Sequence, residues 1–162
     1  MAEDTRENIL KSAVELFSKN NYHAVSMTEI AEGADISKGT LYWHFDSKEE
    51  LFREIAFKGM DYFQQQFQKI AEKDIGSCDK IRQVIKFVLN TFVDHLSMMD
   101  VFRNNIELIS TDFKDTIEVK HQKNIEIVAN IIKQGIEEEK IKAGNPADLA
   151  TMILAVLFTP QT

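Results

Sequence analysis

Two helix starts, on either side of a short break, constrain the fold of this 162-residue chain more than any other feature. Ser26 stands three residues before Glu29, a spacing typical of a capping box, in which the serine oxygen accepts from the Glu29 amide and the carboxylate reaches back. After the break at residues 33–36, Ser37 is placed as the N-cap of a second short helix. Two helices of about two turns around a tight turn form a helix-turn-helix, whose second helix enters the major groove of DNA.

The residues around this break resemble the N-terminal domain of TetR/AcrR-type transcriptional regulators. The resemblance is carried by Ile9-Leu10, Ala13, Leu16-Phe17, Ile30-Ala31, the run from Ile36 to Phe45, and the run from Ser47 to Leu51. It covers roughly residues 5–55 and rests on several elements at fixed offsets. Asn21 and Asp35 stand where the family usually has glycine, and both residue types enter the left-handed region readily.

The resemblance implies an all-α fold in two parts. A helix-turn-helix DNA-binding domain is expected at residues 1–47, and a long helix joins it to a helical ligand-binding and dimerisation domain at residues 48–162, without the final helix of the family. The implied function is that of a ligand-responsive transcriptional regulator, a repressor that binds a palindromic operator as a homodimer. We expect a small apolar or cationic effector to release it, because the second domain has no basic cluster for a phosphate-bearing ligand.

The residues predicted to contact DNA lie in and beside the second short helix: Thr28, Ser37, Lys38, Gly39, Thr40, Tyr42, Trp43, His44 and Lys48. By resemblance, Thr40, Tyr42 and His44 touch bases or phosphates, and Lys48 touches a phosphate. Gly39 is expected to let the backbone approach DNA, since a glycine within a helix costs roughly 1 kcal/mol relative to alanine. Trp43 either covers the apolar seam of the domain or stacks along the DNA backbone, and packing is favoured. Apolar residues at helical spacing are assigned to the core instead: Ile30, Ala31, Leu41 and Phe45.

The charge of the chain opposes bulk attraction to phosphates. The formal net charge is -7, and residues 1–50 hold five Lys and Arg against ten Asp and Glu. Attraction to DNA must therefore be local, through Lys38, Lys48 and the helix N-termini at Ser37 and Ser47. We expect weak non-specific binding, for which a dimeric operator compensates.

Helical periodicity continues through the rest of the chain, where prolines and glycines are few. Ser47 with Glu50 is typical of another capping box. At the last start, Asn145 is the expected N-cap and Pro146 the first helical residue, and the apolar run that follows to Phe158 must be buried within the chain or against another copy. The helices are predicted at about residues 4–19, 47–73, 81–96, 101–109 and 113–140, and from 145 onward.

A ligand pocket in the second domain is implied by the resemblance. Eleven phenylalanines and six methionines provide a large apolar interior, and polar residues on apolar stretches are candidates to orient a ligand. Ordinary core packing is the alternative for each apolar candidate, and a surface position is the alternative for each polar one. The candidates are Phe63, Phe67, Phe92, His95, Met99, Phe102, Asn105, Glu107 and His121.

Several classes of protein are excluded by what the sequence lacks. Four histidines and the single Cys78 show no metal-ligand spacing, and neither a Gly-rich phosphate loop nor a pairable catalytic triad occurs, so no enzyme, metal site or cofactor is expected. One cysteine and no signal peptide or membrane-spanning run favour the cytoplasm. Two other readings remain open: a DNA-binding protein without an effector, and an adaptor whose N-terminal unit binds protein.

Overall fold

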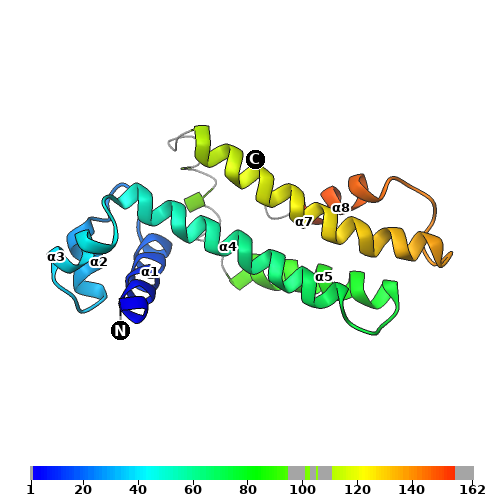
Figure 1. Cartoon of the computed structure of the whole chain (residues 1–162), viewed down its shortest axis with the longest axis horizontal. Coiled ribbons are helices and arrows are strands. Elements are labelled where there is room, and N and C mark those ends of the chain that lie inside the picture. Colours follow the sequence, from blue (N-terminus) through cyan, green and yellow to red (C-terminus); the bar gives the residue numbers. More distant parts are fainter. Residues whose placement is uncertain (1, 95–100, 103–104, 106–110, 156–162) are drawn as a thin grey trace. The chain divides into compact units, whose positions relative to one another are not determined.

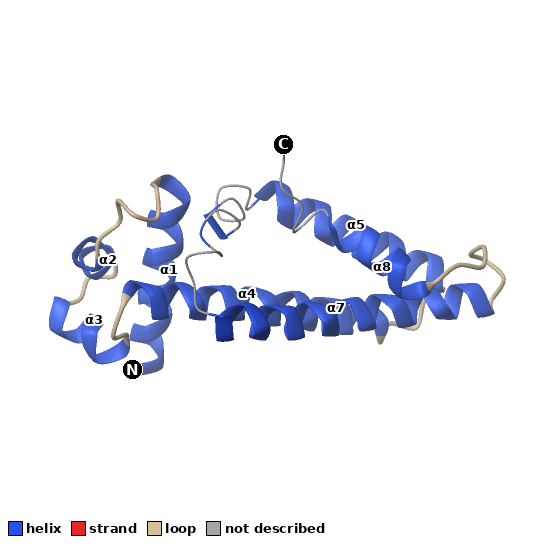
Figure 2. Cartoon of the chain, turned by 90° about the horizontal axis from the view of Figure 1, so that it is seen from above, coloured by secondary structure: helices blue, strands red, loops and turns tan. Residues whose placement is uncertain are grey.

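The chain is all-helical wherever the structure describes it. The computed structural model describes residues 2–94, 101–102, 105 and 111–155, and no strand occurs among them (Figure 2). Their helices, in chain order, are α1 (Ala2–Lys19), α2 (Met27–Gly33), α3 (Lys38–His44), α4 (Lys48–Ala71), α5 (Ser77–Asp94), α7 (Thr111–Glu137) and α8 (Pro146–Leu154) (Figure 1). The predicted fold class is confirmed, and the helices with described bounds follow the predicted order.

Two compact units make up the chain. The first contains residues 1–58 and 97–113, and the second contains residues 59–96 and 114–162. Helix α4 begins in the first unit and ends in the second without a break in its helical assignment. Of the helix predicted at residues 101–109, positions 101, 102 and 105 are helical, and its other residues lie outside the described ranges.

The core of the first unit is formed by one apolar face from each of its helices. Helices α1, α2 and α3 gather around the beginning of α4 (Figure 1). The residues predicted as core, Ile30, Ala31, Leu41 and Phe45, are at most 2% exposed. They pack with apolar residues of α1 and α4 that are equally buried, namely Ile9, Ala13, Phe17, Leu51 and Phe52. The two short helices are therefore held by this shared core.

The turn between α2 and α3 has the predicted caps. The Ser26 hydroxyl oxygen accepts from the Glu29 amide at 3.2 Å, and the Glu29 carboxylate accepts from the Ser26 amide at 2.7 Å. Asp35 adopts the left-handed conformation, with φ of 55°. Asn21 does not: its side-chain oxygen accepts from the His23 amide at 2.9 Å, an Asx turn that makes the left-handed conformation unnecessary.

The start of α4 differs in one detail from the expected capping box. The Ser47 hydroxyl oxygen accepts from the Glu50 amide at 3.1 Å, as predicted. The Glu50 carboxylate, however, accepts from the amide of Asp46 at 2.7 Å, and not from that of Ser47. The reciprocal bond is thus displaced by one residue toward α3, which ties the α3–α4 connection to the first turn of α4.

The second unit contains an aromatic cluster, which extends from buried residues to the surface. The rings of Phe63, Phe67 and Phe87 have centroids 5.4–6.0 Å apart, and the ring of Tyr62 lies 5.8 Å from that of Phe87. Helix α7 lies beside the second part of α4 (Figure 2), and an ion pair between Lys120 and Asp61 joins these two helices. The buried face of α7 is apolar, with Ile125, Val128, Ile131 and Ile132.

Polar contacts close one end of the second unit, where α5 begins and α7 ends. The Ser77 hydroxyl donates to Glu138 at 2.8 Å, and the Lys140 ammonium donates to the same carboxylate at 2.9 Å. The hydrogen bonds from Lys140, Ser77 and Gln134 lower the pKa of Glu138 to about 2. This carboxylate therefore stays ionised through the whole neutral range.

Helix α8 begins as predicted, with the Asn145 side-chain oxygen accepting from the Ala147 amide at 3.0 Å. Within the chain, Ala150 and Leu154 of its apolar run are buried, whereas Met152 is 72% exposed. Burial of this run against another copy, the other predicted possibility, stays a prediction. Residues 156–158 of that run lie outside the described ranges. An apolar side chain thus remains uncovered on α8 within this single chain.

The stability of the second unit is expected to depend on pH through His121. Burial lowers the pKa of His121 below its ordinary value of 6.5, and nearby Glu118 opposes this only in part. At acidic pH the unfolded chain therefore binds more protons at this histidine than the folded protein does. The free energy of unfolding is highest above about pH 6.5 and decreases as the pH falls through the lowered pKa of His121. Melting temperatures between pH 7.5 and 5.5 should fall less for His121→Gln than for the wild type. Equal slopes would contradict this assignment.

Candidate DNA-binding site

Helix α3 turns Leu41 inward, and its C-cap residue Phe45 is buried as well. Leu41 and Phe45 are 0% and 1% exposed, whereas Trp43 is 75% exposed. The favoured prediction that Trp43 packs in the domain is therefore wrong. Residues two apart on a helix point about 200° apart, so the burial of Leu41 forces Trp43 outward. The indole instead meets the His44 ring edge-on, with centroids 4.7 Å apart.

Most of the predicted DNA contacts are open to solvent. Thr28, Ser37, Lys38, Gly39 and Tyr42 are exposed, and Thr40 and His44 are partly exposed. No ion pair is recorded for Lys38 among the described residues, and its ammonium lies 5.9 Å from the centre of the Tyr42 ring. The site thus presents hydroxyls, two aromatic rings and a cation on a helix anchored by its apolar face.

The N-terminus of α3 uses two of these side chains for its own structure. The Ser37 hydroxyl oxygen accepts from the Thr40 amide at 3.0 Å and lies 2.8 Å from the Thr40 hydroxyl oxygen. This satisfies one amide of the first turn, and the remaining amides face outward with the positive end of the helix dipole. Ser37 therefore has a structural role as the N-cap of α3.

Gly39 has open space around its α-carbon. A Cβ built there meets no atom closer than the Ser37 hydroxyl oxygen, at 3.7 Å. Its φ is not in the left-handed region either. Nothing in the described protein therefore requires glycine at this position, although alanine is the better helix former.

Lys48 has a structural role that the sequence did not indicate. Its ammonium donates to the backbone carbonyls of Tyr22 and Val25, both at 2.8 Å, and lies 4.5 Å from the centre of the Tyr22 ring. Burial lowers the pKa of Lys48, and the charge of Glu29 partly offsets this. Since a lysine has three N–H donors, one remains for a phosphate. Substitution of Lys48 would therefore disturb the α1–α2 connection as well as any DNA contact.

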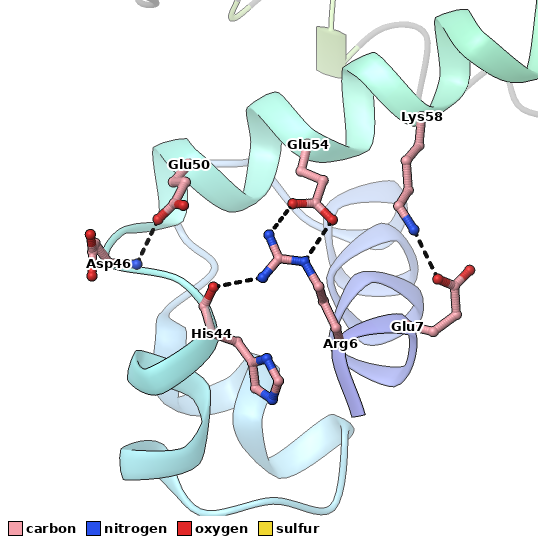
Figure 3. A network of polar contacts seen from close by, with 7 residues as sticks. All are labelled: Arg6, Glu7, His44, Asp46, Glu50, Glu54 and Lys58. Carbon is pink, nitrogen blue, oxygen red and sulfur yellow. Dashed lines mark hydrogen bonds and ion pairs between the residues drawn. The ribbon is translucent and has the colours of Figure 1, made fainter. Parts of the chain in front are cut away.

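Arg6 is the functional candidate that sequence reasoning missed. Its guanidinium donates to Glu54 of α4, through Nε at 2.9 Å and through Nη2, and to the backbone carbonyl of His44 at 2.8 Å (Figure 3). The same group lies 4.2 Å from the centre of the Phe45 ring. No local pattern signals these contacts, because Arg6 and Glu54 are 48 residues apart.

The candidate ligand residues are divided between the two units. Phe63 and Phe67 are buried in the aromatic cluster of the second unit, and Phe92 and His121 of that unit are partly buried. In the first unit, Phe102 stacks on Phe52 with centroids 4.7 Å apart.

The polar candidates are less informative than the aromatic ones. Asn105 is 8% exposed and donates to the Val101 carbonyl at 2.8 Å. His95, Met99 and Glu107 lie outside the described residues. A hollow on the surface of the second unit, lined by Ile75, Asp79, Arg82, Gln83 and Lys86, contains none of the candidates.

Asn124 is a polar group on the apolar face of α7 that was not among the candidates. Its side chain is 3% exposed, and its Oδ1 accepts no hydrogen bond from the described residues. A buried amide without such a bond is costly, so Asn124 suits a place where a ligand donates. Its position beside Ile125 and one turn before Val128 was the signal available in the sequence.

Within the described ranges, no group of three or more His, Cys, Asp or Glu residues is arranged to hold a metal ion. None of the helices described is both long enough and apolar enough to cross a membrane. The chemistry available at the exposed face of α3 is hydrogen bonding and electrostatics.

Comparison with known proteins agrees with this geometry. Residues 9–55 match the family described as bacterial regulatory proteins, tetR family. The uncharacterised HTH-type transcriptional regulator YhgD of Bacillus subtilis is 25% identical over 98% of this chain and 82% of its own length.

Two solved structures share the fold of the chain. FadR of Bacillus subtilis, in complex with stearoyl-CoA, has a TM-score of 0.73 and 22% identity, covering 93% of this chain and 82% of FadR. AibR, in complex with isovaleryl coenzyme A and operator DNA, has a TM-score of 0.76 and 21% identity, covering 94% of this chain and 84% of AibR.

The helix-turn-helix and the helical fold define a DNA-binding transcriptional regulator. The matched region covers the whole helix-turn-helix and the first turns of α4, the elements that carry the site. The chain belongs to the TetR/AcrR family, a non-enzymatic family whose members bind operator DNA and small-molecule effectors.

Proposed function

We propose that the chain represses transcription in the cytoplasm by binding a palindromic operator as a homodimer, and that a small-molecule effector releases it. The observation that carries this proposal is the outward face of α3, where Lys38, Tyr42 and Trp43 are exposed while Leu41 and Phe45 anchor the helix. A helix of seven residues contacts only one half-site, so two copies are needed to read a palindrome.

Contacts to DNA come from four kinds of group in this proposal. Tyr42, His44 and Thr40 touch base edges or phosphates, Lys38 and the remaining donor of Lys48 meet phosphates, and Trp43 stacks along the DNA backbone. Ser37 and Thr28 supply hydroxyls at the N-termini of α3 and α2. Helix N-termini favour anions, which adds attraction where the net charge of the protein does not.

The proposal is tested by binding to DNA fragments that flank the coding region of the protein, measured at two salt concentrations. Tyr42→Ala should weaken binding to a palindromic fragment by about tenfold or more, since a contact worth about 1.4 kcal/mol is lost. Tyr62→Ala is the matched control, because Tyr62 is 50% exposed and Tyr42 is 44% exposed, but Tyr62 lies in the second unit.

Equal binding by the two tyrosine variants would contradict the assigned DNA face. A wild-type protein that binds none of these fragments, but does bind a partner protein through α2 and α3, would instead establish the adaptor reading. Charge reversal at Lys38 separates these readings further, because a DNA reader does not tolerate it.

Gly39→Ala should have opposite effects on stability and on DNA binding. Alanine within a helix is favoured over glycine by up to about 1 kcal/mol, and the open space at Gly39 lets the protein gain that stability. In the complex, the added methyl group meets DNA and weakens binding. Gly59→Ala is the control, because a Cβ at Gly59 meets nothing within 4 Å and Gly59 lies in α4. Gly39→Ala variants that bind the operator as the wild type does would contradict close approach at this position.

The second unit is the proposed receiver of the effector. Phe63 and Phe67 are buried in its aromatic cluster, and the buried amide of Asn124 offers an acceptor on the same helix as the buried Ile125 and Val128. We therefore propose an apolar compound or a lipophilic cation with at least one hydrogen-bond donor. A ligand that binds the DNA-incompetent state about a hundredfold more tightly supplies roughly 2.7 kcal/mol of bias toward release.

The effector proposal is tested with a long-chain alcohol and a long-chain primary amine as probes, and with stearoyl-CoA, which carries phosphates, as the comparison that should have no effect. A true effector should raise the melting temperature and also lower operator affinity, and Asn124→Leu should reduce both effects. A probe that binds tightly but leaves operator affinity unchanged is not an effector. If no compound in a wider screen stabilises the protein, regulation without an effector is supported instead.

A further inference from the structure

We propose that Arg6 is the positioning residue of the recognition helix: its guanidinium links the last carbonyl of α3 to Glu54 of α4 and so fixes the direction in which α3 points. The proposal rests on the proposed function in one respect, since the property that α3 must deliver is operator binding. Arg6 itself lies in α1 and is not among the proposed DNA contacts.

The contacts of Arg6 are shared between two elements. Nε and Nη2 donate to the two carboxylate oxygens of Glu54, while Nη1 donates to the carbonyl of His44 at 2.8 Å (Figure 3). The guanidinium carbon Cζ also lies over the ring of Phe45, 4.2 Å from its centre. One side chain therefore holds the end of α3, the residue after it and α4 together.

The end of α3 needs such a partner. The last carbonyls of a helix receive no hydrogen bond from an amide of the same helix. A cation beside them is favoured by the helix dipole. Isolated helices much shorter than about 12 residues are unstable in water, and α3 has seven residues. Ser37 holds its N-terminus, and Arg6 supplies the equivalent hold at its C-terminus.

Arginine is required by this geometry. A guanidinium has several donors in a fixed plane, which lets it bind a carboxylate with two donors and a carbonyl with a third. A lysine in its place bonds from one nitrogen and does not reproduce the fork. The hydrogen bonds to Glu54 raise the pKa of Arg6, so the guanidinium keeps its charge throughout the neutral range.

A neighbouring ion pair supplies the matched control. Lys58 donates to Glu7 at 2.9 Å, and this pair also joins α1 to α4 (Figure 3). Both of its side chains are 51% exposed, and among the described residues neither forms a hydrogen bond or an ion pair with α3. Lys58→Gln removes the same charge as Arg6→Gln from the same pair of helices, but leaves the end of α3 intact.

The test compares Arg6→Gln, Arg6→Lys and Lys58→Gln for operator affinity, with folding confirmed by the melting transition of each variant. Both Arg6 variants should bind the operator about tenfold or more weakly, and Lys58→Gln should remain within about twofold of the wild type. Equal effects of Arg6→Gln and Lys58→Gln would overturn the proposal, because general charge or α1–α4 pairing would then account for the loss.

Two further measurements separate positioning from direct DNA contact. If Arg6 itself bound a phosphate, the salt slope of operator binding would fall by about one in Arg6→Gln, whereas a positioning residue leaves the slope unchanged. In a double-mutant cycle, Glu54→Gln added to Arg6→Gln should cost no further affinity, since the two residues act through one link. A reduced slope or additive losses would each overturn the proposal.

Hydrogen exchange in the DNA-free protein tests the link without any operator. The amides of Leu41 and Phe45 donate to the carbonyls of Ser37 and Leu41 in the two turns of α3 and its caps. Both amides should exchange faster in Arg6→Gln than in Lys58→Gln. Equal protection would overturn the proposal even if operator binding were observed. If the wild type binds no operator, but exchange is still faster in Arg6→Gln than in Lys58→Gln, the proposed function is contradicted and the positioning role of Arg6 is not.

Discussion

The recognition helix depends on its surroundings for its existence, and this dependence organises the whole first unit. Seven residues do not form a stable helix alone, so α3 persists because Leu41 and Phe45 are buried and both of its ends are held. Each hold comes from a different source, a local serine at one end and a distant arginine at the other. The orientation of α3 therefore depends on contacts among α1, α3 and α4.

The sequence predicted what depends on near neighbours. Ser26, Ser37 and Asn145 each bond within three residues, and those caps stand as expected. The link from Arg6 to Glu54 spans 48 residues and that from Lys48 to Tyr22 spans 26, distances over which one sequence carries no pairing signal. The error at Trp43 has another origin, because its apolar character favoured burial while its phase on the helix forbade it. Asn21 was expected to adopt the left-handed conformation, but its side chain accepts a hydrogen bond from the His23 amide and the conformation is not needed.

Several acidic residues of the first unit have structural roles. Glu29 and Glu50 accept from backbone amides at two helix starts, while Glu7 and Glu54 pair with cations of α1 and α4. Their charges are thus committed to caps and ion pairs, and Lys38 on α3 is left as an exposed cation. A protein with net charge of -7 can in this way keep its local attraction to DNA where α3 is exposed.

The bond from Arg6 ends on a backbone oxygen of His44 and not on its side chain. Every amino acid carries that oxygen, so the side chain at position 44 is free to change without loosening the helix. The orientation of α3 and the recognition of DNA by its side chains therefore depend on different parts of the sequence. Descendants of such a protein can acquire new operator sequences by substitutions on the outward face of α3, while the frame that aims the helix passes on unaltered.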